Sequence, residues 1–103
     1  GLARVPPRLF ALTVLSELSL ADNSLAVLPH AVGQLANLRR LSLARNRLEG
    51  AGLPESLANL TRLRTLDLSA NRLAFLPPHV GSLPTLLVLD VSDNRLSDLP
   101  SEL

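Results

Sequence analysis

The feature that most constrains the fold of this 103-residue chain is a motif that recurs along most of its length. The motif is Leu-x-x-Leu-x-Leu-x-x-Asn-x-Leu, with Val91 in place of one leucine in the last copy, and the copies are spaced by 23, 25 and 23 residues. A fixed period of this length predicts a stack of similar small units, because one unit alone cannot bury its own leucines. The aligned asparagines are Asn23, Asn46, Asn71 and Asn94.

The composition agrees with a core built from one repeated shape. Leucine accounts for 28 residues, whereas Ile, Met, Trp and Tyr are absent and there are only two Phe. Irregular globular cores are usually filled with a mixture of large residues, so this leucine excess favours copies of a single packing unit.

Two local periods alternate inside each unit. Leu18 and Leu20, with their equivalents in later copies, have the spacing of two that predicts a short strand. A Leu-Pro step such as Leu28-Pro29 then opens a stretch with apolar spacing of three, which suits a short 3₁₀ or α turn. Each repeat is therefore expected to form a strand, a bend, a helical turn and a return.

The recurring Leu-x-x-Leu-x-Leu-x-x-Asn-x-Leu block, followed by Leu-Pro-x-x-Leu-x-x-Leu, resembles the leucine-rich repeat family in its 23-residue intracellular and bacterial type. The resemblance implies an α/β solenoid. It places a parallel β-sheet on the concave face and short 3₁₀ or helical turns on the convex face.

The alignment assigns the whole chain, residues 1–103, to a single leucine-rich repeat segment without linkers. The units are a partial repeat 1–14, the repeats 15–37, 38–62 and 63–85, and a last partial repeat 86–103. Because the chain enters the pattern in the middle of a unit and stops after Leu99-Pro100, we expect an excerpt of a longer array. Such a segment would be a monomer, or would associate weakly end to end through uncapped repeats.

The four aligned asparagines are expected to form a structural ladder. Each lies where the chain leaves the strand and turns inward, so its amide can bond the backbone of its own and the next turn. Buried backbone groups left unpaired would cost about 1–3 kcal/mol each. This structural role outweighs a catalytic one.

Candidate functional residues are those that the repeat leaves free. Strand alternation directs the side chains between the core leucines to the concave face. These positions vary while the leucines do not, as on a binding face carried by a fixed scaffold, although a surface without any partner would vary in the same way. The predicted partner-binding residues are Glu17, Ser19, Arg40, Ser42, Arg45, Thr65, Asp67, Val88 and Asp90.

Charge is distributed unevenly along the solenoid. The net charge is +1, but residues 38–62 sum to +3, whereas 15–37 sum to −2 and 86–103 to −3. A basic middle beside Asp67 and Asp90 could steer a charged protein partner. The alternative is solvated charge that keeps a leucine-rich chain soluble. The arginines of the basic middle are Arg39, Arg40, Arg45, Arg47, Arg62 and Arg64.

Other function classes are disfavoured. Without cysteine there is no disulfide framework or thiolate metal site, and His30 and His79 lack partners at ligand spacing. Asp67 and Asp90 should be about 5 Å apart and could do acid–base work or hold a cation, but such pairs more often repel or bind a partner's cations. We therefore expect no enzyme, metal site or cofactor, and no nucleic-acid partner, because aromatic side chains for base stacking are missing from the strands.

The remaining expectations concern context. The two extra residues in the stretch 49–52 are expected to form a bulged turn whose glycines relax the backbone. No stretch is typical of a membrane span or signal peptide, which favours a cytoplasmic location. The resemblance implies a role in signalling, scaffolding or recognition. The alternatives are structural spacer repeats, or a substrate-selecting or autoinhibitory part of a larger enzyme such as a kinase, GTPase or ubiquitin ligase.

Overall fold

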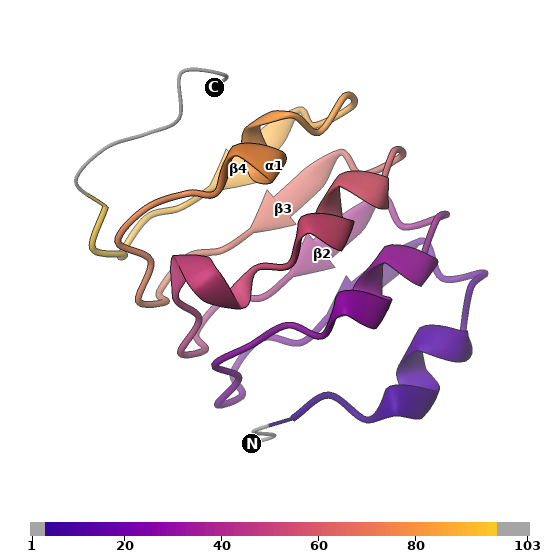
Figure 1. Cartoon of the computed structure of the whole chain (residues 1–103), viewed down its shortest axis with the longest axis horizontal. Coiled ribbons are helices and arrows are strands. Elements are labelled where there is room, and N and C mark those ends of the chain that lie inside the picture. Colours follow the sequence, from indigo (N-terminus) through magenta and orange to yellow (C-terminus); the bar gives the residue numbers. More distant parts are fainter. Residues whose placement is uncertain (1–3, 97–103) are drawn as a thin grey trace.

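A computed structural model describes residues 4–96 of the chain. Its strands β1 (Glu17–Ser19), β2 (Arg40–Ser42), β3 (Thr65–Asp67) and β4 (Val88–Asp90) form one parallel sheet in chain order (Figure 1). Each strand has the position that the spacing of two predicts. The expected step at Leu99-Pro100 lies outside the described residues.

A row of short helical turns lies in front of the sheet in Figure 1 and connects its strands. Three of these turns directly follow the prolines of the Leu-Pro steps, whose fixed φ suits the entry to a helix. The expected solenoid is therefore confirmed. The turns in this row are the 3₁₀ helices η1 (Pro7–Ala11), η2 (His30–Gln34) and η4 (Glu55–Asn59), and the α-helix α1 (Pro78–Gly81). A further 3₁₀ helix, η3 (Gly50–Gly52), precedes η4 and lies beside the row.

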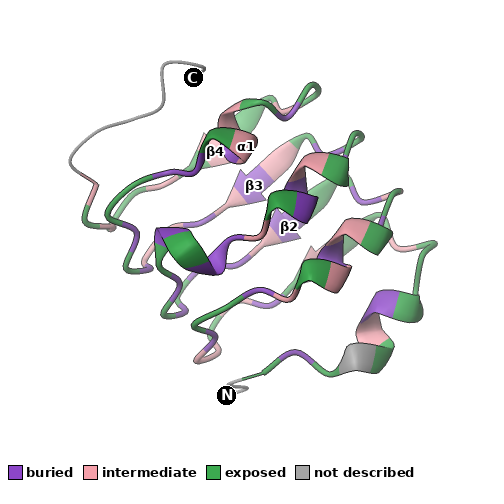
Figure 2. Ribbon diagram, in the orientation of Figure 1, coloured by how far each residue is buried: buried purple, intermediate pink, exposed green. Residues whose placement is uncertain are grey.

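The core lies between the sheet and the helical turns, where Figure 2 shows the buried residues. The middle strand leucines Leu41 and Leu66 are buried, as are Leu38 and Leu63 before those strands. Stacking thus closes a continuous leucine core, as the repeat pattern predicts.

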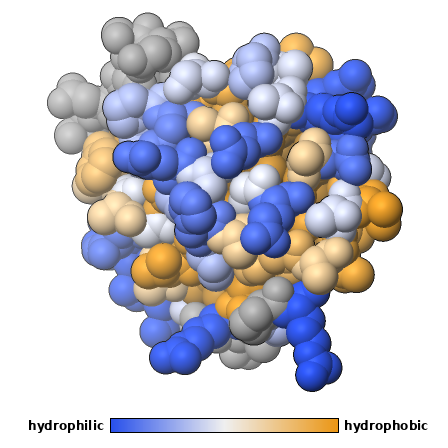
Figure 3. Space-filling view, turned by 45° about the vertical axis from the view of Figure 1, so that its right-hand side comes forward, coloured by the Kyte–Doolittle hydropathy of each residue, from blue (hydrophilic) through white to orange (hydrophobic). Residues whose placement is uncertain are grey.

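On the face seen in Figure 3, hydrophilic and hydrophobic residues are interspersed. Hydrophilic side chains thus lie among hydrophobic ones at this surface, which favours its hydration. Within residues 4–96, no helix has the length and apolar character required to cross a membrane.

The two-residue insertion forms a 3₁₀ turn between β2 and η4. η3 occupies this stretch, and the strands on either side remain in register, with Leu41 opposite Leu66. The carbonyl oxygen of Gly52 accepts a hydrogen bond of 2.9 Å from the N–H of Leu28 in the preceding repeat. The insertion is therefore part of the stacking between repeats.

The glycines of the insertion serve close packing, since no glycine among the described residues has a positive φ. A Cβ added to Gly52 would collide with the backbone carbonyl oxygen of Ala26. A Cβ added to Gly50 would lie 2.6 Å from Cζ of the Phe75 ring, which is half-exposed. The expectation that these glycines relax the backbone is therefore wrong.

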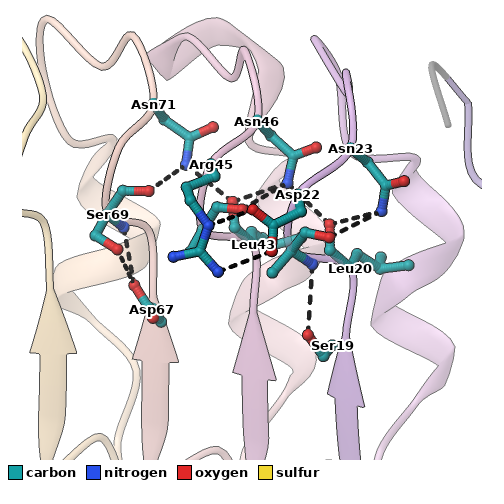
Figure 4. A network of polar contacts seen from close by, with 12 residues as sticks. Ser19, Leu20, Asp22, Asn23, Leu43, Arg45, Asn46, Asp67, Ser69 and Asn71 are labelled. Atoms are coloured by element: carbon teal, nitrogen blue, oxygen red, sulfur yellow. Dashed lines mark hydrogen bonds and ion pairs between the residues drawn. The ribbon is translucent and has the colours of Figure 1, made fainter. Parts of the chain in front are cut away.

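The asparagines connect neighbouring repeats (Figure 4). The buried Asn46 donates from Nδ2 to the carbonyl oxygens of Leu43, at 3.0 Å, and Leu20, at 2.9 Å. Its Oδ1 accepts the N–H of Leu25 at 3.0 Å. The bonds therefore reach the preceding repeat, not the next one as expected, and they satisfy backbone groups on the strand and the turn at once.

The same pattern recurs at Asn71. Its Nδ2 donates to the carbonyl oxygens of Leu68, at 3.1 Å, and Leu43, at 2.9 Å, and its Oδ1 accepts the N–H of Leu48 at 3.0 Å. Asn94 bonds its own and the preceding repeat in the same way, and Asn23 donates to Leu20 within its own repeat.

The substitution Asn71→Ala should lower the free energy of unfolding by about 2–3 kcal/mol, because it leaves the buried N–H of Leu48 unpaired and removes one of the two asparagine donors from the carbonyl oxygens of Leu43 and Leu68. The control Ser69→Ala should cost about 1 kcal/mol or less, because it removes one partly buried hydroxyl bond. Urea unfolding measures both, and equal midpoints would refute the role assigned to Asn71.

The two glycines of η3 should differ in their tolerance of alanine. Gly52→Ala should destabilise the fold by about 1–3 kcal/mol, because its methyl group meets a backbone carbonyl that cannot move without shifting a repeat. Gly50→Ala should cost less, because the half-exposed Phe75 ring can rotate away. Thermal unfolding of the two variants checks this order, and a larger loss for Gly50→Ala would contradict it.

Candidate binding face

The sheet register gathers most of the predicted binding residues into two columns. Residues at the strand starts follow one another from repeat to repeat, and residues at the strand ends do the same, while the leucine between them points into the core. The strand-start column is Glu17, Arg40, Thr65 and Val88, and the strand-end column is Ser19, Ser42, Asp67 and Asp90. Arg45 follows β2 and lies outside both columns.

The strand-start side is basic. Arg40 Nε lies 3.7 Å from Glu17 Oε1, and both side chains are about two-thirds exposed, so this pair contributes little to stability. Arg39 and Arg64 precede β2 and β3 and are also exposed. Together with Arg40 they line a shallow hollow of about 370 Å³ that reaches Leu87.

Sequence reasoning placed Arg39 and Arg64 in the basic middle but left them out of the binding set. The available signal was their position, because both directly precede the first strand residue in consecutive repeats. Their backbones are joined, since the N–H of Arg64 donates to the carbonyl oxygen of Arg39 at 2.8 Å.

The strand-end side is acidic and locally ordered. Asp67 Oδ1 accepts the N–H of Ser69 at 2.9 Å and its hydroxyl at 2.6 Å, and Asp90 bonds Ser92 in the same way. The hydroxyl and N–H of Ser92 lower the pKa of the Asp90 carboxyl below its ordinary value of 3.8. The neighbouring strand positions of Asp67 and Asp90 therefore carry carboxylates that Ser69 and Ser92 orient.

Arg45 is engaged with the preceding repeat. Its guanidinium forms two bonds to the carboxylate of Asp22, one of them from Nη2 to Oδ2 at 2.8 Å (Figure 4). The bond from Arg45 lowers the pKa of Asp22 below its ordinary value of 3.8. A partner would have to displace or share this ion pair to reach Arg45.

The residue before each aligned asparagine has a left-handed backbone, which sequence reasoning missed. Two of the four are aspartates, which tolerate this conformation better than most residues. Their recurrence at one fixed position before a sharp turn was the signal that could have revealed it. The φ angles are 60° at Asp22, 55° at Arg45, 56° at Ala70 and 56° at Asp93.

The basic middle divides into separate groups. Arg39, Arg40 and Arg64 share the strand-start hollow, whereas Arg62 donates from Nη1 to Asn37 Oδ1 at 2.7 Å. Arg45 faces Asp22. The six arginines thus do not form one continuous basic track.

The histidines lie on the helical turns. His79 Nε2 lies 2.9 Å from the carbonyl oxygen of Leu53, and His30 is exposed at the start of η2. Among residues 4–96, no group of three or more His, Cys, Asp or Glu side chains is placed to hold a metal ion.

Comparison with known families identifies the class of protein. A family described as "Leucine Rich repeats (2 copies)" matches residues 36–78 and 61–103, and one described as "Leucine rich repeat" matches residues 1–48. The chain belongs to the leucine-rich repeat family, whose members are typically non-enzymatic modules for protein interaction. A search of curated proteins gives no match.

Several solved structures share the fold. A leucine-rich repeat protein of Leptospira interrogans is 32% identical with a TM-score of 0.76, over 99% of this chain and 31% of its own length. An internalin of Listeria monocytogenes is 26% identical with a TM-score of 0.74, over 87% of this chain and 25% of its own.

A third similar structure is the leucine-rich repeat ectodomain of the Arabidopsis receptor kinase HAESA, in complex with an IDA peptide hormone ligand. It is 36% identical with a TM-score of 0.74, over 87% of this chain and 16% of its own. The chain thus spans less than a third of each of these three proteins.

The substitution Arg45→Gln should raise the pKa of Asp22 toward its ordinary value, because it removes the bonds to the charged carboxylate. A lowered pKa stabilises the folded state above the ordinary value, and this contribution is lost as the pH falls through the lowered value. Wild type and variant should therefore converge in stability as the pH falls below the lowered pKa of Asp22.

Carboxyl-carbon NMR titration of Asp22 and thermal unfolding at neutral and acid pH measure these effects. Arg47→Gln is the matched control, because Arg47 is also exposed and has no bond to Asp22. An Asp22 pKa that stays the same in Arg45→Gln would contradict the assignment.

Proposed function

We propose that this segment is a protein-interaction module that binds its partner on the concave face. The observation that carries the proposal is the pair of variable side-chain columns on a sheet whose leucines are fixed in the core. Short strands in register present these side chains at regular spacing. Such a pre-ordered face loses little conformational entropy on binding.

The charge distribution across the sheet supports a protein partner. Arginines gather at the strand starts, and Asp67 and Asp90 lie at the strand ends. A partner with the opposite arrangement of charges would be oriented as it docks, because like charges meet in the reversed orientation. The peptide hormone in the HAESA complex supports a polypeptide ligand by analogy.

The proposed role is recognition within a signalling or scaffolding protein. A cysteine-free composition supports a cytoplasmic location. The parent protein would then supply any effector activity.

The test compares the proteins retained by immobilised wild-type and variant chains from a lysate of the source organism. The concave variant changes Arg40, Arg45, Asp67 and Asp90 to alanine. The matched control changes Arg47, Arg72, Glu49 and Glu55, which are exposed and also comprise two arginines and two acidic residues. Both variants therefore keep the net charge of the chain.

The concave variant should retain at least about tenfold less of each specific partner than the wild-type chain. This loss is expected because the variant removes several interface contacts of about 1 kcal/mol each. The control should retain them. Thermal unfolding verifies that both variants are folded. Full retention by a folded concave variant would refute the proposed function.

A further inference from the structure

The hollow at the strand starts combines free positive charge with exposed apolar surface. It has a volume of about 370 Å³ and is lined by Arg39, Arg40 and Arg64 on one side and by Leu87 and Val88 on the other. The side chains of Leu87 and Val88 are 79% and 54% exposed, in a chain whose core leucines are almost completely buried.

Successive repeats place the main residues of the hollow on a hydrogen-bonded column. The N–H of Leu87 donates to the carbonyl oxygen of Arg64 at 2.8 Å, and Arg64 donates in turn to Arg39 at 2.8 Å. Adjacent members are therefore about one strand spacing, roughly 4.8 Å, apart. The column is apolar at Leu87 and basic at the next two positions.

The two arginines of this column are available to a ligand. Neither Arg39 nor Arg64 forms an ion pair with another described residue, in contrast to Arg40, which lies near Glu17, and Arg45, which binds Asp22. Guanidinium groups that form no ion pair with a neighbouring residue favour carboxylate ligands, which they can bind through two parallel hydrogen bonds.

We propose that this hollow binds an extended acidic peptide segment that crosses the strand starts. Carboxylates of the segment bind Arg64 and Arg39, and an apolar side chain packs on Leu87 and Val88. This assignment rests on the proposed function and specifies the class of ligand for one part of the face.

The dimensions set the spacing of the ligand's side chains. Two rungs of the column span about 10 Å, and an extended peptide advances about 3.3 Å per residue. An apolar residue and two acidic residues spread over about four positions therefore match Leu87, Arg64 and Arg39. Beyond Arg39, Glu17 lies beside Arg40, so it repels a longer acidic tract and limits the site to a short one.

A nucleic acid fits the hollow less well. Its backbone has no group to cover the exposed Leu87 and Val88, and the hollow has no aromatic side chain for base stacking. Glu17 on its lining would also repel phosphates.

The test uses fluorescence anisotropy with the whole chain and a labelled, amidated peptide of about twelve residues. The peptide carries one leucine and two glutamates within four positions, in a glycine and serine background. Two matched peptides replace the glutamates by glutamine or the leucine by serine, and a single-stranded RNA of equal length serves as competitor.

The protein variants separate charge from apolar contact. Combined Arg39→Gln and Arg64→Gln should weaken binding about tenfold, and Leu87→Ser several-fold. Combined Arg47→Gln and Arg72→Gln is the control, because it removes the same charge at exposed positions outside the hollow, and it should change binding less than about twofold. Added salt should weaken the wild-type complex.

Equal binding of the glutamate and glutamine peptides, no effect of the Arg39 and Arg64 substitutions, or displacement by RNA at equal concentration would overturn the assignment. Failure here is distinct from failure of the proposed function. If the concave variant loses its partners but no acidic peptide binds, only the assignment of the hollow falls. If the concave variant keeps all partners, the proposed function falls whatever the peptide does.

Discussion

The interaction on which the rest of the structure depends is the bridge to the preceding repeat that Asn46, Asn71 and Asn94 make. Asn46 and Asn71 each use one amide to satisfy carbonyl groups of two repeats and an N–H of the earlier one. Burial of the leucine side chains favours stacking of the repeats, but the hydrophobic effect is not directional. The asparagine bonds are directional, so they fix the position of each turn on its neighbour and keep the strands in register.

Because leucines and asparagines together hold the fold, the residues on the exposed face of the sheet are free to vary. Leucines and asparagines satisfy the core and the backbone, so the strand-start and strand-end positions can take arginine, serine or aspartate without loss of the fold. Unpaired arginines on one side and ordered carboxylates on the other give the face an electrostatic direction across its width. Proteins of this family use such surfaces to bind other proteins.

The sequence predicted the features that depend on the spacing of the repeated apolar residues and on their chemistry. Spacing of two and spacing of three place the strands and helical turns correctly, because each reflects burial of one face. It could not predict in detail which atoms of neighbouring copies would meet. The bond of Asn46 to the earlier repeat, the engagement of Arg45 by Asp22 and the tight packing at Gly52 all depend on how one turn lies on the next. Arg39 and Arg64 were left out of the binding set because their one signal, a shared position directly before the first strand residue, lies outside the strands.

Native-state amide hydrogen exchange at Leu25, Leu48 and Leu73 tests the central claim most directly. The N–H groups of these residues donate to the Oδ1 atoms of Asn46, Asn71 and Asn94 of the following repeat. If the asparagine bridges join the repeats, these amides exchange only when the stack unfolds, with the protection of the core strands. Exchange at the rate of exposed loop amides, while the strands stay protected, would contradict the account.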